Sequence, residues 1–222
     1  MERKIVRTAD GSKTLRLPAW EEAYHSMHGA LQEAYHVFIR SGLDQFQSRE
    51  LSLLEMGFGT GLNALITLLE APARQLRIRY TALEAFPLVA SEWEALEYGQ
   101  LFPEREMASR FFTQLHQAPW EKPCQLTPDF ELCKLQKDFL DFESEPRFDL
   151  IYFDAFGARV QPELWTEAVF RSMYAALQPG GLLVTYAAKG SVRRGMQAVG
   201  FGVERLPGPP GKREMLRARK AL

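Results

Sequence analysis

The residues best suited to chemistry begin with an acid followed by glycines at every second position. The run reads Glu55-Met-Gly57-Phe58-Gly59-Thr-Gly61. Such glycines let the backbone approach a ligand, and the amino end of the following helix presents free N–H groups to it. The spacing differs from the dinucleotide fingerprint, whose glycines stand at the first, third and sixth positions. Because an acid attracts a cationic amine, Glu55 favours an amino acid cofactor such as S-adenosylmethionine (SAM), and a plain tight turn is the simpler alternative.

Further acids follow two later strands and could bind the adenosine of such a cofactor. Glu84 stands at the carboxyl end of the second expected strand, where open α/β sheets bind ligands and a carboxylate can accept both ribose hydroxyls. Asp138 and Phe139 follow the third strand, where the acid could accept from the adenine amino group and the ring could stack on the base. A solvated strand end and a solvated loop acid are the alternatives.

Asp154-Ala-Phe156 ends the fourth expected strand and faces the same crevice. An amine that accepts a methyl group must be neutral, so an acid here could take its proton or hold it in line with the sulfonium methyl. Asp154 is therefore the predicted catalytic residue. The alternative is a cap on the following helix, although Pro162 lies far along the chain for that role.

Alternating strands and helices are expected to position these residues. Apolar runs between glycine and proline turns predict strands at 51–56, 77–84, 130–135, 148–153 and 182–187, helices at 62–69, 87–98, 162–177 and 189–199, a turn at 179–181, and an antiparallel pair at 201–206 and 214–219. This order predicts an α/β, Rossmann-like methyltransferase fold. Its sheet is doubly wound and mostly parallel, with a C-terminal antiparallel hairpin.

The chain has 222 residues, 46% of them hydrophobic, which is enough for one substantial core. We expect a SAM-dependent methyltransferase domain at 51–222 and an N-terminal extension at 1–50 that covers the site. At about 100–130 the apolar period is lost and four prolines appear. This segment is expected to be an irregular insertion, either a lid or a packing excursion.

No stretch approaches the roughly 18 uninterrupted apolar residues of a membrane helix, and residues 1–10 lack the apolar core of a signal peptide. A cytoplasmic protein without a membrane partner is therefore expected. Cys124 and Cys133 are the two cysteines, and no further candidate ligand accompanies them. We expect two reduced thiols, no disulfide framework and no metal site.

The net charge of −1 hides a segregation along the chain. Residues 51–188 carry eleven basic and nineteen acidic side chains, whereas residues 189–222 carry nine basic and two acidic ones. A basic tail on an acidic domain is typical of a surface that binds a phosphate backbone. A solvated basic helix and hairpin is an equally good interpretation of charge alone.

The chain resembles the methyltransferase half of the bifunctional tRNA wobble-uridine modification enzymes called MnmC, including its standalone MnmD form. The matching segments run along nearly the whole chain. They are Tyr24–Glu33, Tyr35–Phe38, Glu55–Asn63, Glu84 with Phe86-Pro87, Asp154–Phe156, Gln161–Trp165, Pro179–Gly181, Val192–Gly195 and Gly211–Leu216.

The resemblance implies SAM-dependent N-methylation of 5-aminomethyluridine, usually 2-thiolated, at the tRNA wobble position, giving the 5-methylaminomethyl product. It assigns Asp154 to the reacting amine and places Asn63 with the cofactor turn. The FAD-dependent half of the bifunctional enzymes has no counterpart in 222 residues. The aminomethyl group is therefore expected to be present ready made or to come from a separate enzyme.

One loop departs from the family pattern. After Asp154–Phe156 the family usually has an Ala-Pro pair and a lysine, whereas this chain has Gly157-Ala158-Arg159-Val160. Arg159 could replace the missing cation one residue early. The departure bears on the shape of the substrate loop and on the choice of nucleoside.

Docking on the anticodon stem-loop is expected to use the basic tail and an aromatic stack. A single-stranded loop base can be extruded and stacked on an aromatic ring while cations contact the phosphates. The predicted substrate-binding residues are Lys189, Arg193, Arg194, Lys212 and Arg213 for the phosphates, and Tyr24 or Phe156 for the base.

Three other functions remain as alternatives. An aminopropyltransferase of the polyamine synthase type shares the fold, but it needs several acids around the amine, and the neighbours of Asp154 are Phe156, Gly157 and Arg159. A SAM-dependent methyltransferase of small amines is the second. A non-enzymatic RNA-binding module is the third, supported by the basic tail and disfavoured by the cofactor turn with Glu84 and Asp154.

Overall fold

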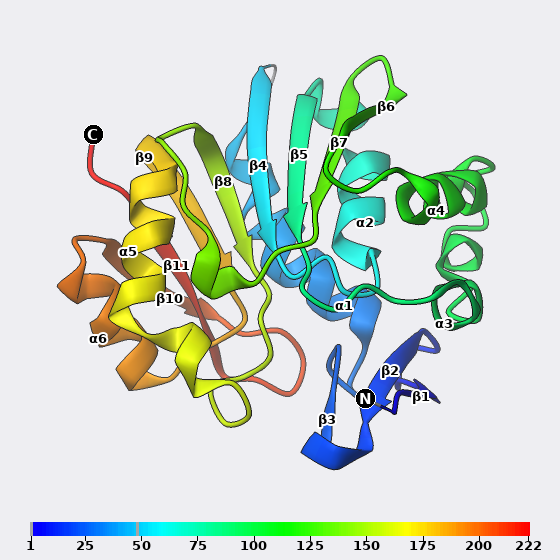
Figure 1. Ribbon diagram of the computed structural model, residues 1–222, viewed down its shortest axis with the longest axis horizontal. Helices are drawn as coiled ribbons and strands as arrows, with labels where there is room; N and C mark the ends of the chain where they lie inside the picture. The colour runs from blue at the N-terminus through cyan, green and yellow to red at the C-terminus, as the bar shows by residue number, and fades with distance from the viewer. Residues whose placement is uncertain (1, 48) are drawn as a thin grey trace.

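The centre of the structure is an eight-stranded sheet. The computed structural model describes residues 2–47 and 49–222, and the sheet they form has the order β10-β11-β9-β8-β4-β5-β7-β6 (Figure 1). Its parallel strands are β4 (Glu50–Met56), β5 (Arg77–Leu83), β7 (Phe130–Leu135), β8 (Phe148–Phe153) and β9 (Leu177–Thr185). The antiparallel strands are β6 (Pro123–Thr127) at one edge and β10 (Gly202–Pro207) with β11 (Glu214–Arg219) at the other. The predicted α/β fold with a C-terminal hairpin is confirmed.

Helices cover both faces of this sheet. They are α1 (Ala30–Ala34), continued by a π-helical segment η2 (Tyr35–Arg40), then α2 (Leu62–Glu70), α3 (Ala90–Glu94), α4 (Ala108–Gln117), α5 (Glu167–Ala176) and α6 (Gly190–Ala198). Short 3-10 turns lie at Pro18–Trp20, Leu43–Gln45, Pro72–Arg74, Tyr98–Leu101, Phe139–Asp141 and Pro162–Trp165. No helix within 2–47 and 49–222 is long and apolar enough to cross a membrane.

Two adjacent residues of β4 show that the sheet lies between two layers of helices, each with its own apolar core. Leu53 packs into the core that contains the apolar side chains of α1, α2 and α4, whereas Leu54 packs into the core of α5 and α6. Successive side chains of a strand point to opposite faces, so a strand covered on both sides must be apolar throughout. The last four residues of β8, Leu150–Phe153, satisfy this and are all fully buried.

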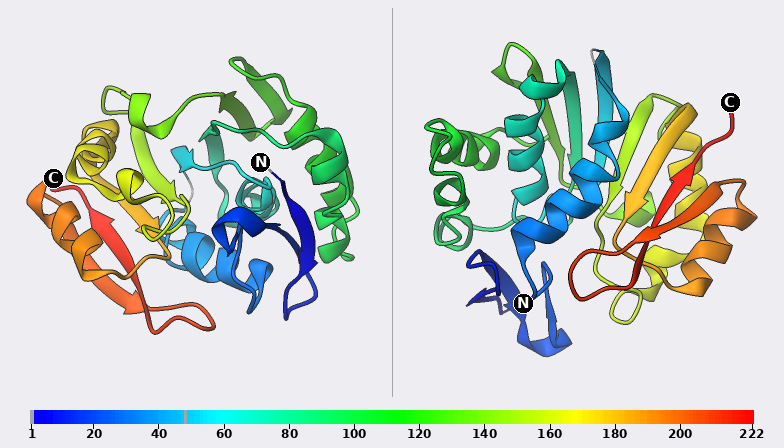
Figure 2. Two further views of the ribbon diagram at one scale, coloured as in Figure 1. Left: turned by 60° about the horizontal axis from the view of Figure 1, so that its bottom comes forward. Right: turned by 180° about the vertical axis from the view of Figure 1, so that it is seen from behind.

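A second, three-stranded sheet precedes the main one. It consists of β1 (Lys4–Arg7), β2 (Lys13–Leu17) and β3 (Glu22–Ala23), in antiparallel order. Figure 1 and both views of Figure 2 show it beside the carboxyl ends of β4 and β5, with α1 leading from it to the main sheet. The N-terminal segment therefore lies where open α/β sheets bind ligands.

The segment 100–130 is not irregular, which corrects the expectation. Its helix α4 is amphipathic, with Ala108, Phe112 and Leu115 buried on one face and polar residues elsewhere. Flanking prolines hide this short period in the sequence. Pro123 is tolerated because β6 is an edge strand, where a missing backbone N–H breaks no central ladder.

Three other predicted elements differ in extent. The helix expected at 162–177 is divided at Thr166, whose extended backbone separates the 3-10 turn Pro162–Trp165 from α5. The helix expected from Pro87 to Tyr98 is reduced to α3, because Glu97 adopts a left-handed φ of 55° that ends helical geometry. The turn expected at Pro179–Gly181 lies inside β9, where the pairing with β8 shifts register between Phe148 and Leu150.

Candidate active site

A cavity of about 780 Å³ opens at the carboxyl ends of the parallel strands. Four of these strands deliver a lining residue directly after their last position: Gly57 after β4, Glu84 after β5, Asp154 after β8 and Tyr186 after β9. Asp138 lines the cavity three residues after the end of β7. The sequence-predicted residues that line the cavity are Tyr24, Gly57, Phe58, Gly59, Asn63, Glu84, Asp138, Phe139, Asp154, Phe156 and Lys212. Parallel strand order alone brings together acids that are 70 positions apart in sequence.

The turn after β4 requires glycine for a steric reason. Gly57 has φ +104°, and a Cβ there would lie 2.9 Å from the carbonyl oxygen of Asp154. The next glycine, Gly59, has φ +49°, and its N–H donates to Oε2 of Glu84 at 2.9 Å. The turn thus packs bare backbone against the end of β8, where a side chain at position 57 would collide with the Asp154 carbonyl oxygen.

Glu84 is held by the backbone on both carboxylate oxygens. Oε2 accepts from Gly59, and Oε1 accepts from the N–H of Phe86 at 2.8 Å. Each oxygen keeps a second lone pair for a ligand hydroxyl. Beside it, Phe86 and Leu140 line the cavity although their side chains are largely exposed, at 69% and 54%. This end of the cavity combines a fixed carboxylate with apolar walls.

Asp138 turns its carboxylate toward its own backbone. Its Oδ1 accepts from the N–H of Leu140 at 2.9 Å and caps the 3-10 turn that contains Phe139. Phe139 is buried, at 9% exposure, and its ring lies 3.6 Å from the position of a Cβ on Gly57. The pair therefore shapes the wall between the glycine turn and the exposed Leu140.

Glu55 does not line the cavity. Its side chain is fully buried, its carboxylate oxygens accept no hydrogen bond from the described residues, and Asn63 Oδ1 and Tyr80 Oη are likewise unpartnered. Burial, followed by the charge of Asp154, raises the pKa of Glu55 well above its usual value. We therefore interpret Glu55 as a neutral carboxylic acid beneath the turn, because β4 directs it toward the face that carries α2. Gly61, at the start of α2, packs on His116 and also lies outside the cavity lining.

Asp154 lies at the other end of the cavity, and its Oδ2 accepts from Asn63 Nδ2 at 2.8 Å. Burial raises the pKa of Asp154 to about 7, and the charge of Glu33 adds to this. The hydrogen bond from Asn63 and the charge of Lys212 act in the opposite direction. A carboxyl group with such a pKa can both take and release a proton near neutral pH.

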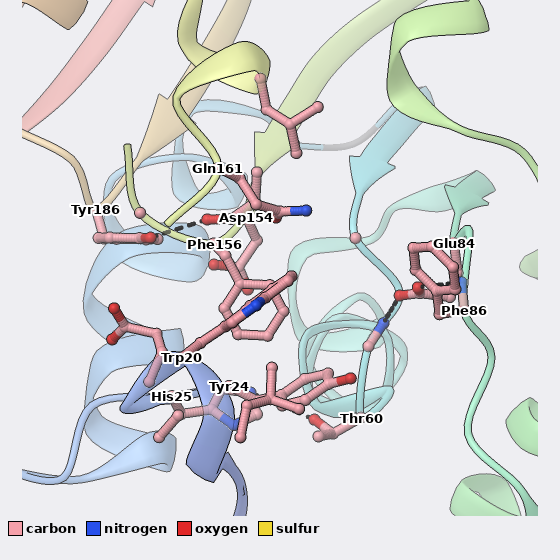
Figure 3. Close-up of a pocket in the computed structure, with 18 of the residues that line it drawn as sticks. Trp20, Tyr24, His25, Thr60, Glu84, Phe86, Asp154, Phe156, Gln161 and Tyr186 are labelled. Carbon is pink, nitrogen blue, oxygen red and sulfur yellow. Dashed lines mark hydrogen bonds between the residues drawn. The ribbon is translucent and has the colours of Figure 1, made fainter. Parts of the chain in front are cut away.

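Aromatic rings stand over this end of the cavity (Figure 3). Phe156 makes edge contacts with Tyr24 and Trp20, with ring centroids 4.9 and 5.6 Å apart. Tyr186 also lines the cavity, and its hydroxyl donates to the carbonyl oxygen of Ala155 at 2.8 Å. Flat apolar rings with polar edges suit a planar heterocycle.

The N-terminal sheet is tied to the rim by Arg3. Its guanidinium donates to both carboxylate oxygens of Glu92, to the carbonyl oxygen of Phe86 and to the hydroxyl of Tyr24, at 2.9 to 3.3 Å. On the other side Arg159, in the loop that departs from the family pattern, donates to Glu22 at 3.0 Å and to the carbonyl oxygen of Trp20 at 3.1 Å. The cation at 159 thus joins the substrate loop to the N-terminal sheet.

Beneath this sheet, His25 joins two threonines. Its Nδ1 lies 3.0 Å from Thr14 Oγ1, and its Nε2 lies 3.3 Å from Thr60 Oγ1. Burial lowers the pKa of His25 to about 4, so the ring is neutral at physiological pH. It fastens β2 to the glycine turn.

A family model described as S-adenosyl-L-methionine-dependent methyltransferase matches residues 109–221, just over half of the chain. The chain belongs to this methyltransferase family. SAM is accordingly the cofactor, and the methyltransferase has a cavity that fits it. Gly57 and Gly59 line the cavity without side chains, and each carboxylate oxygen of Glu84 keeps a second lone pair for a ligand. The lining residues that would hold SAM at this end are those of the glycine turn at 57–59, with Glu84, Asp138 and Phe139.

Curated relatives of the methyltransferase are longer proteins. Two are named tRNA 5-methylaminomethyl-2-thiouridine biosynthesis bifunctional protein MnmC: that of Cupriavidus necator is 34% identical over 89% of this chain, and that of Cupriavidus metallidurans is 31% identical over 92%. The chain spans about a third of their length, 32% of each. The similarity therefore concerns one part of those proteins.

Two solved structures have the same fold. MNMC2 from Aquifex aeolicus is 26% identical, covers the whole of this chain and 72% of its own, and superposes with a TM-score of 0.76. The spermidine synthase of Thermotoga maritima covers 98% of this chain and 68% of its own, with a TM-score of 0.56 and 14% identity. The second likeness shows the fold alone.

The predicted phosphate contacts divide into three groups. Lys189, Arg194 and Arg213 are exposed, and Arg194 reaches back to Gly190 at the start of α6. Arg193 is half-buried, and its Nε is enclosed without a partner among the described residues. Lys212 lines the cavity and is paired with Glu33 at 2.6 Å, so its ammonium belongs to the pocket rather than to the outer surface.

Several lining residues were missed by sequence reasoning. Glu33, Trp20, Arg3 and Tyr186 lie at the site although none stands in a motif of its own. Glu33 is the last residue of the segment Tyr24–Glu33, and the match of that segment to the family is the sequence signal that could have identified it. Its role became visible only with its partner in the hairpin loop. Within 2–47 and 49–222 no group of three or more His, Cys, Asp or Glu side chains is placed to hold a metal ion.

Proposed function

We propose that this methyltransferase methylates the primary amine of 5-aminomethyluridine, with or without 2-thiolation, at the wobble position of tRNA. Its product is the 5-methylaminomethyl nucleoside. The relatives' name supports this substrate, and the observation that carries the proposal is the half-buried Asp154 oriented by Asn63. Another active site would have to generate the aminomethyl group beforehand.

Asp154 is proposed to prepare the amine. SAM, when bound, supplies a methyl group on a sulfonium. The ammonium of the acceptor must lose a proton to free its lone pair, and the Asp154 carboxylate can take that proton because its pKa is raised to about 7. Transfer of that methyl group would form a nitrogen–carbon bond and break the carbon–sulfur bond of the cofactor. Asn63 fixes the carboxylate, so the amine is held in line with the methyl group.

The aromatic cluster is proposed to receive the wobble base. Extruding a base from a single-stranded loop requires little energy, and a stacking surface offsets that cost. Tyr24, Trp20 and Phe156 form this surface over Asp154 (Figure 3). We further propose that residues 1–50 act as an extension covering the methyltransferase domain of residues 51–222. The exposed cations Lys189, Arg194 and Arg213 would then contact the anticodon stem.

An aminopropyltransferase remains the competing proposal, because the Thermotoga maritima spermidine synthase shares the fold. A polyamine needs unpaired carboxylates along its length. Here Glu33 is already paired with Lys212, and Glu55 does not line the cavity. The cavity therefore holds a fixed cation, Lys212, at the end that contains Asp154, and this charge would repel a polyamine.

The deciding experiment is a reaction of the purified protein and SAM with tRNA bearing 5-aminomethyl-2-thiouridine. The RNA is digested and its nucleosides are analysed by mass spectrometry. The proposal expects one added methyl group on that nucleoside and none on unmodified tRNA. Binding of SAM without any change in the nucleoside would reject the substrate and direct the search to small amines and polyamines.

A further inference from the structure

Lys212 and Glu33 form an ion pair at the acceptor end of the cavity. Lys212 Nζ donates to Glu33 Oε1 at 2.6 Å, and the other oxygen of Glu33 accepts from the N–H of Ser26 at 2.9 Å. The same ammonium lies 3.8 Å from the ring centroid of Tyr186. Glu33 is 9% exposed, whereas the side chain of Lys212 keeps 33% exposure. The ammonium is thus fixed on two sides and open to the cavity.

The loop that carries Lys212 is itself fastened. Gly211 packs so closely on His28 that a Cβ would lie 2.1 Å from the imidazole Cδ2. His36 Nε2 lies 2.8 Å from the carbonyl oxygen of Pro207 at the end of β10. The hairpin loop is therefore held against the N-terminal segment at two points, and the position of Lys212 is determined by packing.

A cation at this position disfavours the binding of a methyl acceptor whose only polar group is an amine. Lys212 would repel the incoming ammonium, and its charge lies close enough to oppose the rise in the pKa of Asp154. An acceptor with an electron-rich oxygen beside the amine reverses that balance, because the oxygen can accept from the remaining Lys212 N–H. Uracil has such an oxygen: its C5 substituent is adjacent to the carbonyl at C4.

We propose that Lys212, held by Glu33 and Tyr186, donates a hydrogen bond to O4 of the acceptor base and so selects uridine over cytidine. This inference rests on the proposed function and adds the residue that recognises the base. Cytidine presents an N4 amino group at the same place, which is a donor and would face the ammonium without an acceptor. Sites built to hydrogen-bond a substrate group discriminate strongly against an analogue that lacks it.

The test compares two synthetic anticodon stem-loops with 5-aminomethyluridine or 5-aminomethylcytidine at the wobble position. The wild-type protein should show kcat/KM at least about tenfold higher for the uridine form. Lys212→Gln should bring that ratio to about one or invert it, because the amide oxygen can accept from N4. Lys212→Arg keeps a donor and should keep the preference. The ratio of the two kcat/KM values does not depend on how much of a variant is folded. If a variant is too slow to assay, its affinities for the two stem-loops are compared instead by fluorescence anisotropy.

Arg213→Gln is the matched control, since it removes one positive charge from the neighbouring, 89% exposed position. It should weaken both stem-loops alike and leave the ratio unchanged. An unaltered ratio in Lys212→Gln, or equal wild-type activity on both stem-loops, overturns this inference and leaves the proposed function intact. Methylation of neither stem-loop by the wild-type protein overturns the proposed function, and this inference with it.

Discussion

Asn63 donates a hydrogen bond of 2.8 Å to Oδ2 of Asp154, linking the first turn of α2 to the end of β8. Among the residues that the structure describes, the other oxygen of Asp154 accepts no hydrogen bond. The carboxylate is therefore oriented from one side and open to the cavity on the other. This geometry gives the first two predictions.

Asp154→Asn should bind SAM with unchanged affinity and lose about 10² to 10⁴ in turnover, the range for removal of a general base. Asparagine keeps the shape and can still accept from Asn63. Turnover is measured as transfer of labelled methyl to tRNA, and SAM affinity by isothermal titration calorimetry. Undiminished turnover would move the base elsewhere, with Tyr186 or water as the next candidates.

The pH profile should reflect the raised pKa of Asp154. Only the ionised carboxylate takes a proton, so kcat/KM should fall below pH of about 7, and Asp154→Asn should lack this acidic limb.

The raised pKa of Asp154 also bears on stability. Because the folded-state pKa exceeds the unfolded value, the folded protein binds the proton more tightly, and this group lowers stability as pH rises from about 4 to about 7. At pH 8, Asp154→Asn should raise the free energy of unfolding, by up to about 4 kcal/mol for a pKa that moves from 3.8 to about 7, as measured by urea denaturation. A less stable variant at pH 8 contradicts this.

Glu55→Gln tests whether that residue acts by charge. A neutral, buried carboxylic acid is nearly isosteric with an amide, so SAM affinity should change by less than about threefold. Calorimetry on the purified variant measures it. A loss of tenfold or more would show that an ionised Glu55 attracts the cofactor, as its position before the glycine turn had suggested.

Gly57→Ala should abolish detectable SAM binding and lower the free energy of unfolding by about 1 to 3 kcal/mol, because its Cβ would lie 2.9 Å from the Asp154 carbonyl oxygen. Gly11→Ala is the matched control. Gly11 also has a positive φ, +86°, but no atom lies within 4 Å of its Cβ position. It should lose stability from backbone strain alone and bind SAM normally. Equal loss of SAM binding in both variants would contradict the steric argument.

Lys189→Ala combined with Arg194→Ala should weaken tRNA binding. The slope of the logarithm of the binding constant against the logarithm of the salt concentration should become shallower by about 1.5, as expected for two lost phosphate contacts. Arg79→Ala is the control, since Arg79 pairs with Glu50 near the amino ends of β4 and β5, away from the cavity. Filter binding between low and moderate salt gives both slopes. Equal slopes for the double variant and the wild type would place the docking surface elsewhere.

The sequence by itself determined the features that depend on neighbouring residues. The turn at Gly57 needs left-handed backbone, and the apolar run of β8 needs burial on both faces, so both were predictable from local pattern. The order of strands and helices then implied that Glu84 and Asp154 meet at one edge of a parallel sheet. Helix α4 escaped prediction because flanking prolines interrupt its short period.

The tertiary structure alone decided which side chains enter the cavity. Glu55 directly precedes the cofactor turn, yet the alternation of β4 directs it into the core beneath. Lys212 belongs to a basic tail, yet the packing of Gly211 on His28 brings it to Glu33, 179 positions away. Such pairings depend on how distant segments pack, and no local periodicity encodes them. For this reason the charge pattern along the chain predicted that Lys212 contacts phosphates at the surface, whereas the fold places it in the pocket.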